Sequence, residues 1–406
     1  VVQYYASINH NRDQGALKTD RLNQFDVNVK NNTTSFRVNL NVDLKVGIRF
    51  LFNSSTNLDK YHGPYQQPAQ AYSLAFHASP VDFSPLYPGD ETYSWPHLRF
   101  GTTTSNQTNP YMLVHQGYME RQRYSTINRA EYIHNLSSLV KGLEIRASIS
   151  LNKTGYVAEA YNTVPFKYTL QDYDFETGKH TLRAMNAKLA RRTLSYDSRS
   201  SGQTSSTTIT YEGRVYHTAA WGGEENMKHQ TSLTAVLQAQ DQVNDPVESV
   251  LDGFPKRNLG FSMRGTYGFK DRYFAEASFG YNGSERFAKK NRMGFFPAGG
   301  VAWVVSNEKF MESVYKTIHY LKLRFSYGKV GNDGIVNKPR FVYLPTIVTK
   351  DFIKDPDANG LNSMSRYRIE AYANKNIQWE IAEQMNFGLD FKLFNGMFDI
   401  TIDAYE

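Results

Sequence analysis

Cysteine is absent from the 406 residues of this chain. That absence excludes a disulfide framework and a thiolate metal site. The ten histidines form no His-Glu-x-x-His pattern, and none stands beside paired carboxylates at the spacing of metal ligands. We therefore expect neither a metal ion nor any other cofactor.

Long apolar runs are also missing. No stretch approaches the roughly 18 apolar residues of a membrane helix, and the mean hydropathy is −0.56. These features are typical of a soluble protein, but a membrane β-barrel escapes the test, because its strands need only about 10 residues and half of those face water. No signal peptide opens the chain at Val1, so we expect either a mature protein or a chain that continues upstream.

Runs of basic residues are the third missing feature. The formal net charge is +7, but the 46 Lys and Arg residues are scattered through the chain. Such scattering disfavours a nucleic-acid partner. Attraction to anionic lipid head groups or to acidic ligands fits this balance better.

Paired carboxylates suited to acid–base chemistry are scarce. Glu224 and Glu225 are adjacent, and Asp241 lies close to Asp245. Two carboxylates must flank a bond at a defined distance to cleave a glycoside, whereas adjacent residues on a strand point to opposite faces. The sequence therefore predicts no enzyme.

Aromatic residues, in contrast, are abundant. They make up 14% of the chain, and 28 of them are Tyr. Tyr has an apolar body and a polar tip, which suits either a boundary between water and lipid or stacking on sugar rings.

The stretch 258–332 has the clearest pattern. From Leu259 to Phe269 every odd position is apolar, aromatic or Gly, and after a three-residue interruption at 270–272 the same alternation runs from Tyr273 to Tyr281. A period of two indicates β-strands with one apolar and one polar face. The short interruption predicts an antiparallel hairpin.

Two architectures fit such strands. In a soluble sandwich the apolar face packs on a second sheet, whereas in an outer-membrane barrel it meets lipid and the polar face lines a watery lumen. Connection lengths favour the barrel, because the short link at 270–272 is followed by longer ones at 282–294 and after Gly328. A soluble, secreted β-protein that binds glycans remains the alternative.

Several blocks of the chain resemble the TonB-dependent outer-membrane transporters of the SusC/RagA type. They include Asn282-Gly283-Ser284-Glu285-Arg286-Phe287, Asn291-Arg292-Met293-Gly294-Phe295-Phe296-Pro297, Asn376-Ile377-Gln378-Trp379-Glu380 and Asn109-Pro110-Tyr111, together with the runs 270–274, 307–311, 321–332 and 386–390 and with Trp303. The order and spacing of these blocks carry the resemblance, since each block alone is short.

This resemblance implies a fold, a location and a function. The family has a plug and a barrel of about twenty-two strands in the outer membrane of Gram-negative cells. It imports oligosaccharides or peptides, energised by TonB, under a surface lipoprotein of the SusD/RagB type. The implied partners are therefore that lipoprotein, the TonB complex, outer-membrane lipid and the ligand.

Alternating stretches elsewhere raise the expected number of strands to about thirteen. An odd number of strands leaves an open edge, which lipid does not tolerate. We therefore expect residues 1–406 to form one partial β-barrel domain, roughly the first half of such a barrel, without the N-terminal plug and the C-terminal strands.

Three long loops are expected, at 53–122, 152–204 and 330–375, opposite short turns at Leu44-Lys45, Lys270-Asp271 and Asn395-Gly396. Loop 53–122 is rich in Pro and aromatic residues, which argues for an ordered, functional loop at the barrel mouth. Its candidate substrate-binding residues are Tyr87, Tyr93 and Trp95, whose rings could stack on sugars or peptide side chains. The alternative is that these rings pack the loop against the barrel wall.

The alternation also predicts which way side chains face. In the run 143–149 we expect Leu143, Ile145, Ala147 and Ile149 to face lipid, and Glu144, Arg146 and Ser148 to face the lumen. Tyr273, Phe279, Phe295 and Phe296 are expected in an aromatic girdle near strand ends. The tract 198–208, rich in Ser and Thr, is expected at a loop tip.

Overall fold

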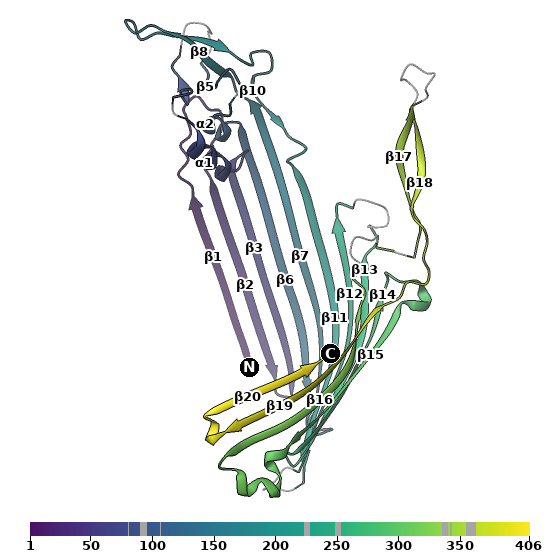
Figure 1. Ribbon diagram of the computed structural model, residues 1–406. Coiled ribbons are helices and arrows are strands. Elements are labelled where there is room, and N and C mark those ends of the chain that lie inside the picture. Colours follow the sequence, from purple (N-terminus) through teal and green to yellow (C-terminus); the bar gives the residue numbers. More distant parts are fainter. Residues whose placement is uncertain are drawn as a thin grey trace.

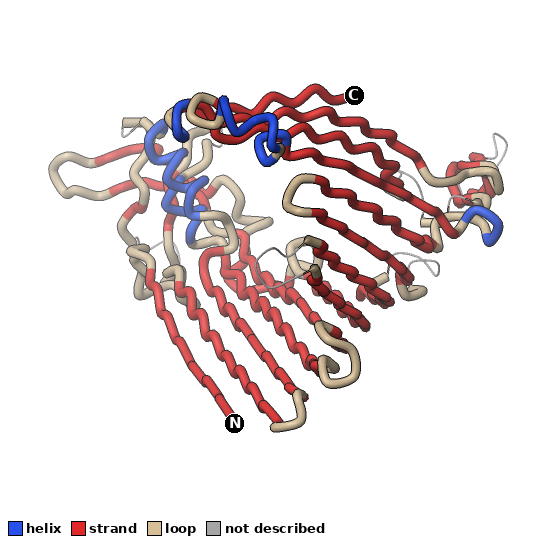
Figure 2. The backbone as a smooth tube through the Cα atoms, turned by 90° about the horizontal axis from the view of Figure 1, so that it is seen from below, coloured by secondary structure: helices blue, strands red, loops and turns tan. Residues whose placement is uncertain are grey.

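The computed structural model describes residues 1–79, 81–89, 96–105, 107–222, 228–247, 253–334, 340–341, 343–354 and 363–406. Thirteen strands in these ranges follow one another through a single antiparallel sheet, and β10 (Arg191–Tyr196) pairs beside β7. The thirteen are β1 (Val2–Gln14), β2 (Lys30–Leu44), β3 (Ile48–Pro64), β6 (Gly117–Asn135), β7 (Leu143–Val164), β11 (Gly202–Trp221), β12 (His229–Asp245), β13 (Lys256–Phe269), β14 (Tyr273–Ser284), β15 (Met293–Val304), β16 (Ile318–Asn332), β19 (Glu380–Leu393) and β20 (Phe398–Tyr405). The sheet curves around an open interior from its N-terminal to its C-terminal strand (Figure 2). This confirms the prediction of an all-β, antiparallel fold.

Short turns and long loops lie at opposite ends of the sheet, as predicted (Figure 1). Residues 45–47, 270–272 and 394–397 connect strands at one end, and 65–116, 165–201 and 333–379 connect them at the other. Lys270 and Asp271 both have positive φ, 53° and 51°, and Arg272 N–H donates to the Phe269 carbonyl at 3.0 Å. Such a turn matches the right-handed twist of the strands that it joins.

Two of the three long loops are shorter than the sequence predicts, because their strands run further, whereas the third, predicted at 330–375, lies at 333–379. β3 continues to Pro64 and β6 begins at Gly117, so the predicted loop 53–122 contains parts of two strands. β7 likewise reaches Val164, and the tract 198–208 lies mostly in β11, not at a loop tip. In these stretches apolar side chains are sparse or stand on both faces, as Val157 and Ala158 do in β7, so the alternation on which the prediction rests is lost.

Helices and small strands fill the remaining irregular segments. They are α1 (Pro68–His77), α2 (Pro110–Val114), β4 (Leu86–Tyr87), β5 (Arg99–Gly101), β8 (Lys167–Tyr173), β9 (His180–Ala184), the hairpin β17 (Thr346–Lys354) with β18 (Ser363–Ala371), and the 3₁₀ turns η1 (Lys289–Asn291), η2 (Val305–Asn307), η3 (Lys309–Val314) and η4 (Phe394–Gly396). None of the helices in the described part of the chain is long and apolar enough to cross a membrane.

The two faces of the sheet differ in chemistry. Ile149 pairs in register with Tyr211, and Leu237 lies two residues along on the same face; the side chains of all three are exposed. Glu144 and Arg146, which occupy the alternate positions of β7, form an ion pair of 2.7 Å on the other face. Side chains at the alternate positions Ala158 and Ala160 are buried, as expected on the concave, inner side. The predicted division of β7 between an outward apolar face and an inward polar face therefore agrees with the structure.

The predicted aromatic girdle is wrong for one residue, Phe296. Phe296 occupies an inward position of β15 and is buried, because it packs against Trp379. Tyr273 and Phe295 are exposed on the outward face, and the Tyr273 ring stacks on Trp303 with 6.4 Å between centroids. Strand parity thus separates Phe296 from its neighbour Phe295.

Strands β1, β2, β3, β6 and β7 are longer than a membrane requires. β7 has 22 residues, whereas a membrane strand needs about 9–11. The unbroken run of outward apolar positions ends at Leu151, because Lys153 follows at the next outward position. The upper parts of these strands therefore stand beyond the apolar band and carry the long loops.

Candidate functional site

Two loop clusters cover the long-loop end of the sheet. We call the first the α2 cluster: it consists of α1, α2 and the small sheet β4-β5-β8-β9, in which β5 and β8 pair in parallel. Its apolar centre holds Ala71, Leu113 and Val114, with Leu17 and Leu74 packed against them. Loops 15–29, 65–116 and 165–201 therefore form one packed unit.

Asn109 ties this cluster together. Its side-chain oxygen caps α2 by accepting hydrogen bonds from the N–H groups of Tyr111 (2.9 Å) and Met112 (3.3 Å), and Pro110 fills the first helical position. Its amide nitrogen donates to the carbonyls of Pro85 (2.8 Å) and Gly101 (3.0 Å). With only 1% of its surface exposed, Asn109 uses both ends of its amide, which explains a motif that the sequence offered only as a resemblance.

Two buried histidines lie beside α2. His97 Nε2 and the Tyr168 hydroxyl are 2.7 Å apart, and His115 Nδ1 lies 2.9 Å from the Tyr111 carbonyl. Burial lowers the pKa of His115, although the hydrogen bond to Tyr111 and the charge of Asp20 oppose this shift. The neutral ring therefore donates from Nδ1. Both histidines line a small cavity of about 60 Å³.

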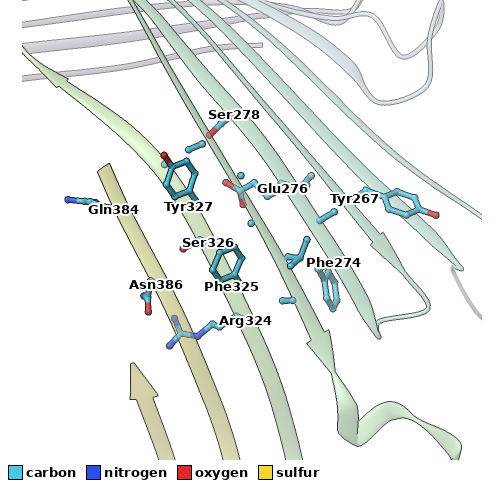
Figure 3. Close-up of a pocket in the computed structure, with 18 of the residues that line it drawn as sticks. Tyr267, Phe274, Glu276, Ser278, Arg324, Phe325, Ser326, Tyr327, Gln384 and Asn386 are labelled. Atoms are coloured by element: carbon cyan, nitrogen blue, oxygen red, sulfur yellow. The ribbon is translucent and has the colours of Figure 1, made fainter. Parts of the chain in front are cut away.

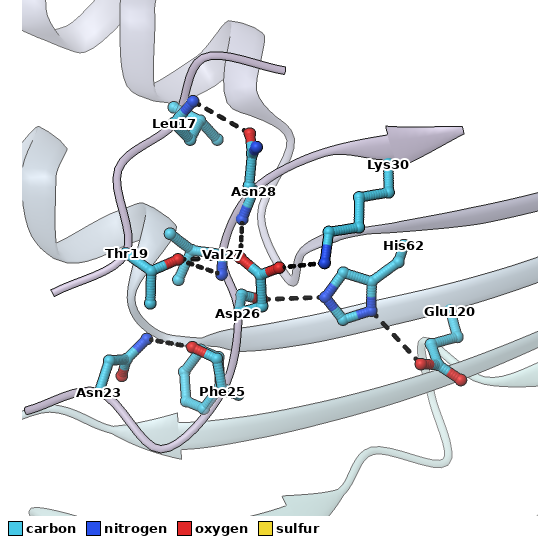
Figure 4. A network of polar contacts seen from close by, with 10 residues as sticks. All are labelled: Leu17, Thr19, Asn23, Phe25, Asp26, Val27, Asn28, Lys30, His62 and Glu120. Carbon is cyan, nitrogen blue, oxygen red and sulfur yellow. Dashed lines mark hydrogen bonds and ion pairs between the residues drawn. The ribbon is translucent and has the colours of Figure 1, made fainter. Parts of the chain in front are cut away.

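Loop 15–29 folds onto the outward face of β2 and β3 (Figure 4). The Asp26 carboxylate accepts hydrogen bonds from Lys30 Nζ (2.6 Å), the Asn28 N–H (2.8 Å) and the Thr19 hydroxyl (2.9 Å). Burial raises the pKa of Asp26, but these hydrogen bonds outweigh it and hold the pKa at about 2. The Asp26 carbonyl and the Glu120 carboxylate lie 2.9 and 3.3 Å from the two ring nitrogens of His62.

The second loop cluster, here the Trp379 cluster, joins the loop after β14 to the segment before β19. Trp379 contacts Phe287 and Phe296 with centroid distances of 5.4 and 5.1 Å. Its indole N–H donates to the Arg292 carbonyl at 3.2 Å. A Cβ added at Gly294 would collide with the Phe296 ring. Three of the sequence blocks that carry the family resemblance therefore meet at one point.

The predicted binding residues are placed as follows. Tyr87 lies on β4 inside the α2 cluster, is 9% exposed, and its ring contacts His180 at 6.0 Å between centroids. Tyr93 and Trp95 lie outside the described residues. The binding role of all three stays a prediction. Sequence patterns alone did not single out Asn109, His97, His115 and Trp379 as site residues, although Asn109 and Trp379 belong to the blocks that carry the family resemblance.

Several charges on the inner face of the sheet are paired. Arg264 makes two 2.7 Å contacts with Glu276, and Arg324 bridges Asp390 (3.1 Å) and Asp403 (2.9 Å). A second group of ion pairs crosses β6, β7 and β11 and comprises Arg129, Glu131, Arg146, Glu212 and Arg214.

A groove of about 1510 Å³ follows this inner face between β11 and β20. Glu276 and Ser278 from β14 and Ser326 from β16 are among its lining residues (Figure 3). The lining mixes charged, hydroxyl and amide side chains with Gly, Ala and aromatic residues such as Phe274 and Phe325, so it offers contacts to both polar and apolar parts of a solute.

The described side chains give little support for a metal site or for acid–base catalysis. Among the described residues no three His, Asp or Glu side chains are grouped so that they could hold a metal ion. Asp241 forms an ion pair of 3.2 Å with Arg257, which leaves it ill suited to act as one of two catalytic carboxylates. Glu224 and Glu225 lie outside the described residues.

Comparisons with known proteins agree with this geometry. The chain is 30% identical over 190 residues to the TonB-dependent receptor SusC of Bacteroides thetaiotaomicron, which covers 45% of this chain and 18% of that protein. It is 23% identical over 426 aligned positions to the TonB-dependent receptor P26 of Formosa agariphila, covering 100% of this chain and 38% of the relative. No protein-family model matches.

A solved structure has a similar fold. The RagAB peptide transporter superposes with a TM-score of 0.60 and 17% identity, covering 100% of this chain and 42% of that one. The resemblance to TonB-dependent receptors of the SusC/RagA type is confirmed. This SusC/RagA-like sheet belongs to a β-barrel of the Gram-negative outer membrane, so the soluble alternative is wrong. The chain spans less than half the length of these relatives.

Proposed function

We propose that this chain is the barrel wall and outer-loop platform of an importer that takes up oligosaccharides or peptides. The relatives that it matches are named as receptors and transporters, not as enzymes. We further propose that a plug and more strands complete the barrel, that TonB energises transport, and that a SusD/RagB-like lipoprotein covers the outer end. Among the described strands, β1 and β20 each pair with a neighbour on one side only, which leaves two edges at which further strands could close the barrel.

The observation that carries this proposal is the pairing of a polar, grooved inner wall with two ordered loop clusters at the outer end. The groove measures about 1510 Å³, which exceeds the roughly 300–1,000 Å³ of a small-molecule pocket. An oligomeric, polar ligand suits such a space. The loop clusters stand where a ligand arrives from outside, and Tyr87, Tyr93 and Trp95 belong to the same loop.

Native mass spectrometry of the intact receptor, extracted from outer membranes in mild detergent, tests the proposal. We expect a lipoprotein to co-purify, together with a series of bound oligosaccharides or peptides. Uptake of that ligand by cells should stop when TonB is deleted. A receptor that carries no ligand and whose deletion leaves nutrient uptake unchanged would overturn the proposal.

A second measurement tests the proposed binding residues. Replacing Tyr93 and Trp95 together with Ala should weaken ligand capture while surface levels stay normal, because flat aromatic faces are lost. The matched control is Phe175→Ala, since Phe175 is 90% exposed between β8 and β9. Equal uptake by the double variant and the control would assign Tyr93 and Trp95 to packing.

A further inference from the structure

A row of three polar side chains crosses the N-terminal edge of the sheet. Arg12 on β1 pairs in register with Asn32 on β2, and Asn32 pairs with Lys60 on β3. All three occupy the same parity as Ile8, Phe36 and their outward neighbours. Because neighbouring strands lie about 4.8 Å apart, the Arg12 and Lys60 backbones are separated by two such spacings, with an amide between them.

The apolar band ends just below this row. Ile8, Phe36 and Leu58 are outward residues of the same three strands, with 74%, 46% and 44% of their surface exposed. Only His10 and Thr34, whose side chains lie 2.9 Å apart, stand between Ile8 or Phe36 and the row. Since the apolar band marks the hydrocarbon region of the membrane, the row lies at the level of the lipid head groups. The long loops identify this leaflet as the outer one.

Loop 15–29 borders this row on the side away from the apolar band. Loop 15–29 crosses the same outward face through the contacts of Asp26 with Lys30 and His62 (Figure 4). Asp26 therefore neutralises Lys30. In the part of the chain that the structure describes, no ion pair involves Arg12 or Lys60. We call this row the ledge. It has two exposed cations, with loop 15–29 on its loop side and the apolar side chains of Ile8, Phe36 and Leu58 on its membrane side.

We propose that this ledge binds the phosphate groups of an outer-leaflet lipid, which in a Gram-negative cell is lipopolysaccharide. Arg and Lys form strong, charge-assisted hydrogen bonds with phosphate oxygens, and Asn32 adds an amide donor. The acyl chains of the same lipid would lie over Ile8, Phe36 and Leu58. A free phosphate ion would use the cations but not these apolar side chains, so the combination points to a lipid.

The experiment titrates the purified, full-length receptor in detergent with lipopolysaccharide and counts bound molecules by native mass spectrometry. A basic residue at an anionic membrane surface contributes about 1 kcal/mol, so the double variant R12Q/K60Q should bind about thirtyfold more weakly. Enzymatically dephosphorylated lipopolysaccharide should bind the wild-type protein with the same loss. Inorganic phosphate alone should compete only weakly.

The matched control is Arg37→Gln. Arg37 lies on β2 as well, but it pairs with Ser7 and Ser55 at an inward position. This control should bind the lipid as the wild type does, and R12K/K60R should retain most of the binding. Equal loss in R37Q and R12Q/K60Q would show a general charge effect and overturn the proposal. If R12Q/K60Q does not fold, the wild-type comparison decides, because equal binding of phosphorylated and dephosphorylated lipid would also overturn it.

Discussion

Trp379 and Phe287 lie 5.4 Å apart between ring centroids, although Phe287 follows β14 and Trp379 precedes β19. Phe287 has none of its surface exposed. The indole N–H of Trp379 also donates to the Arg292 carbonyl in the same loop as Phe287. One aromatic residue thereby joins two outer loops that neither strand pairing nor sequence neighbourhood connects.

Replacing Trp379 with Ala should loosen both loops. Trp379 is half-buried, so its truncation should cost less than the roughly 3–5 kcal/mol of a fully buried aromatic side chain. The Arg292 carbonyl loses the indole donor and keeps the hydrogen bond from the Ser284 N–H at 3.0 Å. The barrel should still assemble, because Trp379 lies outside the strands. We expect faster protease cleavage in residues 285–292 and 372–379, with unchanged heat resistance of the sheet on gels.

Phe295→Ala provides the control for that experiment. Phe295 is an aromatic neighbour in the same block, but 57% of its surface is exposed on the outward face. Its loss should leave loop cleavage near the wild-type rate. Equal cleavage in both variants would contradict the role of Trp379 as the connection between the loops.

Ile145→Arg should destabilise insertion of the sheet. Ile145 occupies an outward position of β7, in register with Val215 of β11, and a charge at the bilayer midplane costs about 2–4 kcal/mol. Urea titration of the protein folded into lipid vesicles measures this difference. Ser148→Arg adds the same charge at an inward position, so it should cost much less, and similar losses in the two variants would refute the assignment of faces.

The sequence predicts the wall of this molecule better than its outer end, for a physical reason. Where one face meets lipid, as from Leu143 to Ile149, alternation is enforced and the strands can be recognised. Beyond Leu151 both faces of β7 meet water or protein, so alternation no longer marks the strand. The parity that separates Phe295 from Phe296 depends on register, which a local run of aromatic residues does not reveal.

The loop clusters depend on contacts between distant segments. Asn109 caps α2, a local role that an Asn-Pro pair suggests. Its donation to the carbonyls of Pro85 and Gly101 requires the path of the whole loop. Trp379 similarly reaches Phe287 only because β14, β15, β16 and β19 are neighbours in the sheet. No periodicity within one segment encodes such contacts.

Asn109→Ala should unfold the α2 cluster locally. The change removes the helix cap, worth about 1 kcal/mol. It also leaves the buried Gly101 carbonyl without its Asn109 donor, at about 1–3 kcal/mol, whereas the Pro85 carbonyl keeps a longer hydrogen bond of 3.4 Å from the Gly101 N–H. Limited proteolysis within residues 65–116 should accelerate while the strands stay protected.

Asn109→Asp separates the two roles of Asn109. It keeps the oxygen that caps α2 but replaces the donor nitrogen. If the contacts with the carbonyls dominate, its rate of proteolysis should therefore be close to that of the Ala variant. Thr104→Ala, a change at an exposed position in the same loop, serves as the control. Wild-type cleavage rates in both Asn109 variants would show that the cluster does not depend on this side chain.

The α2 cluster should also loosen as the pH falls through about 6.5, the ordinary pKa of histidine. Burial lowers the pKa of His115 in the folded loop. A locally unfolded loop therefore takes up a proton at a pH at which the folded loop does not. Protonation then favours the open loop, so the stability of the cluster is present above pH 6.5 and declines below it. Hydrogen exchange of residues 109–116, measured between pH 7.5 and 5.5, should show less protection at the acidic end after correction for intrinsic exchange.

His115→Gln isolates the contribution of this histidine, because an amide retains a donor for the Tyr111 carbonyl but does not titrate in this range. Its protection should be lower than that of the wild type at pH 7.5 and nearly independent of pH. Asp26 cannot account for the effect, since hydrogen bonds hold its pKa at about 2, and its contribution to stability is lost only as the pH falls from about 4 towards 2. A wild-type cluster and a His115→Gln cluster that lose protection in parallel between pH 7.5 and 5.5 would assign the pH dependence to other groups, with His97 beside Tyr168 the next to be replaced.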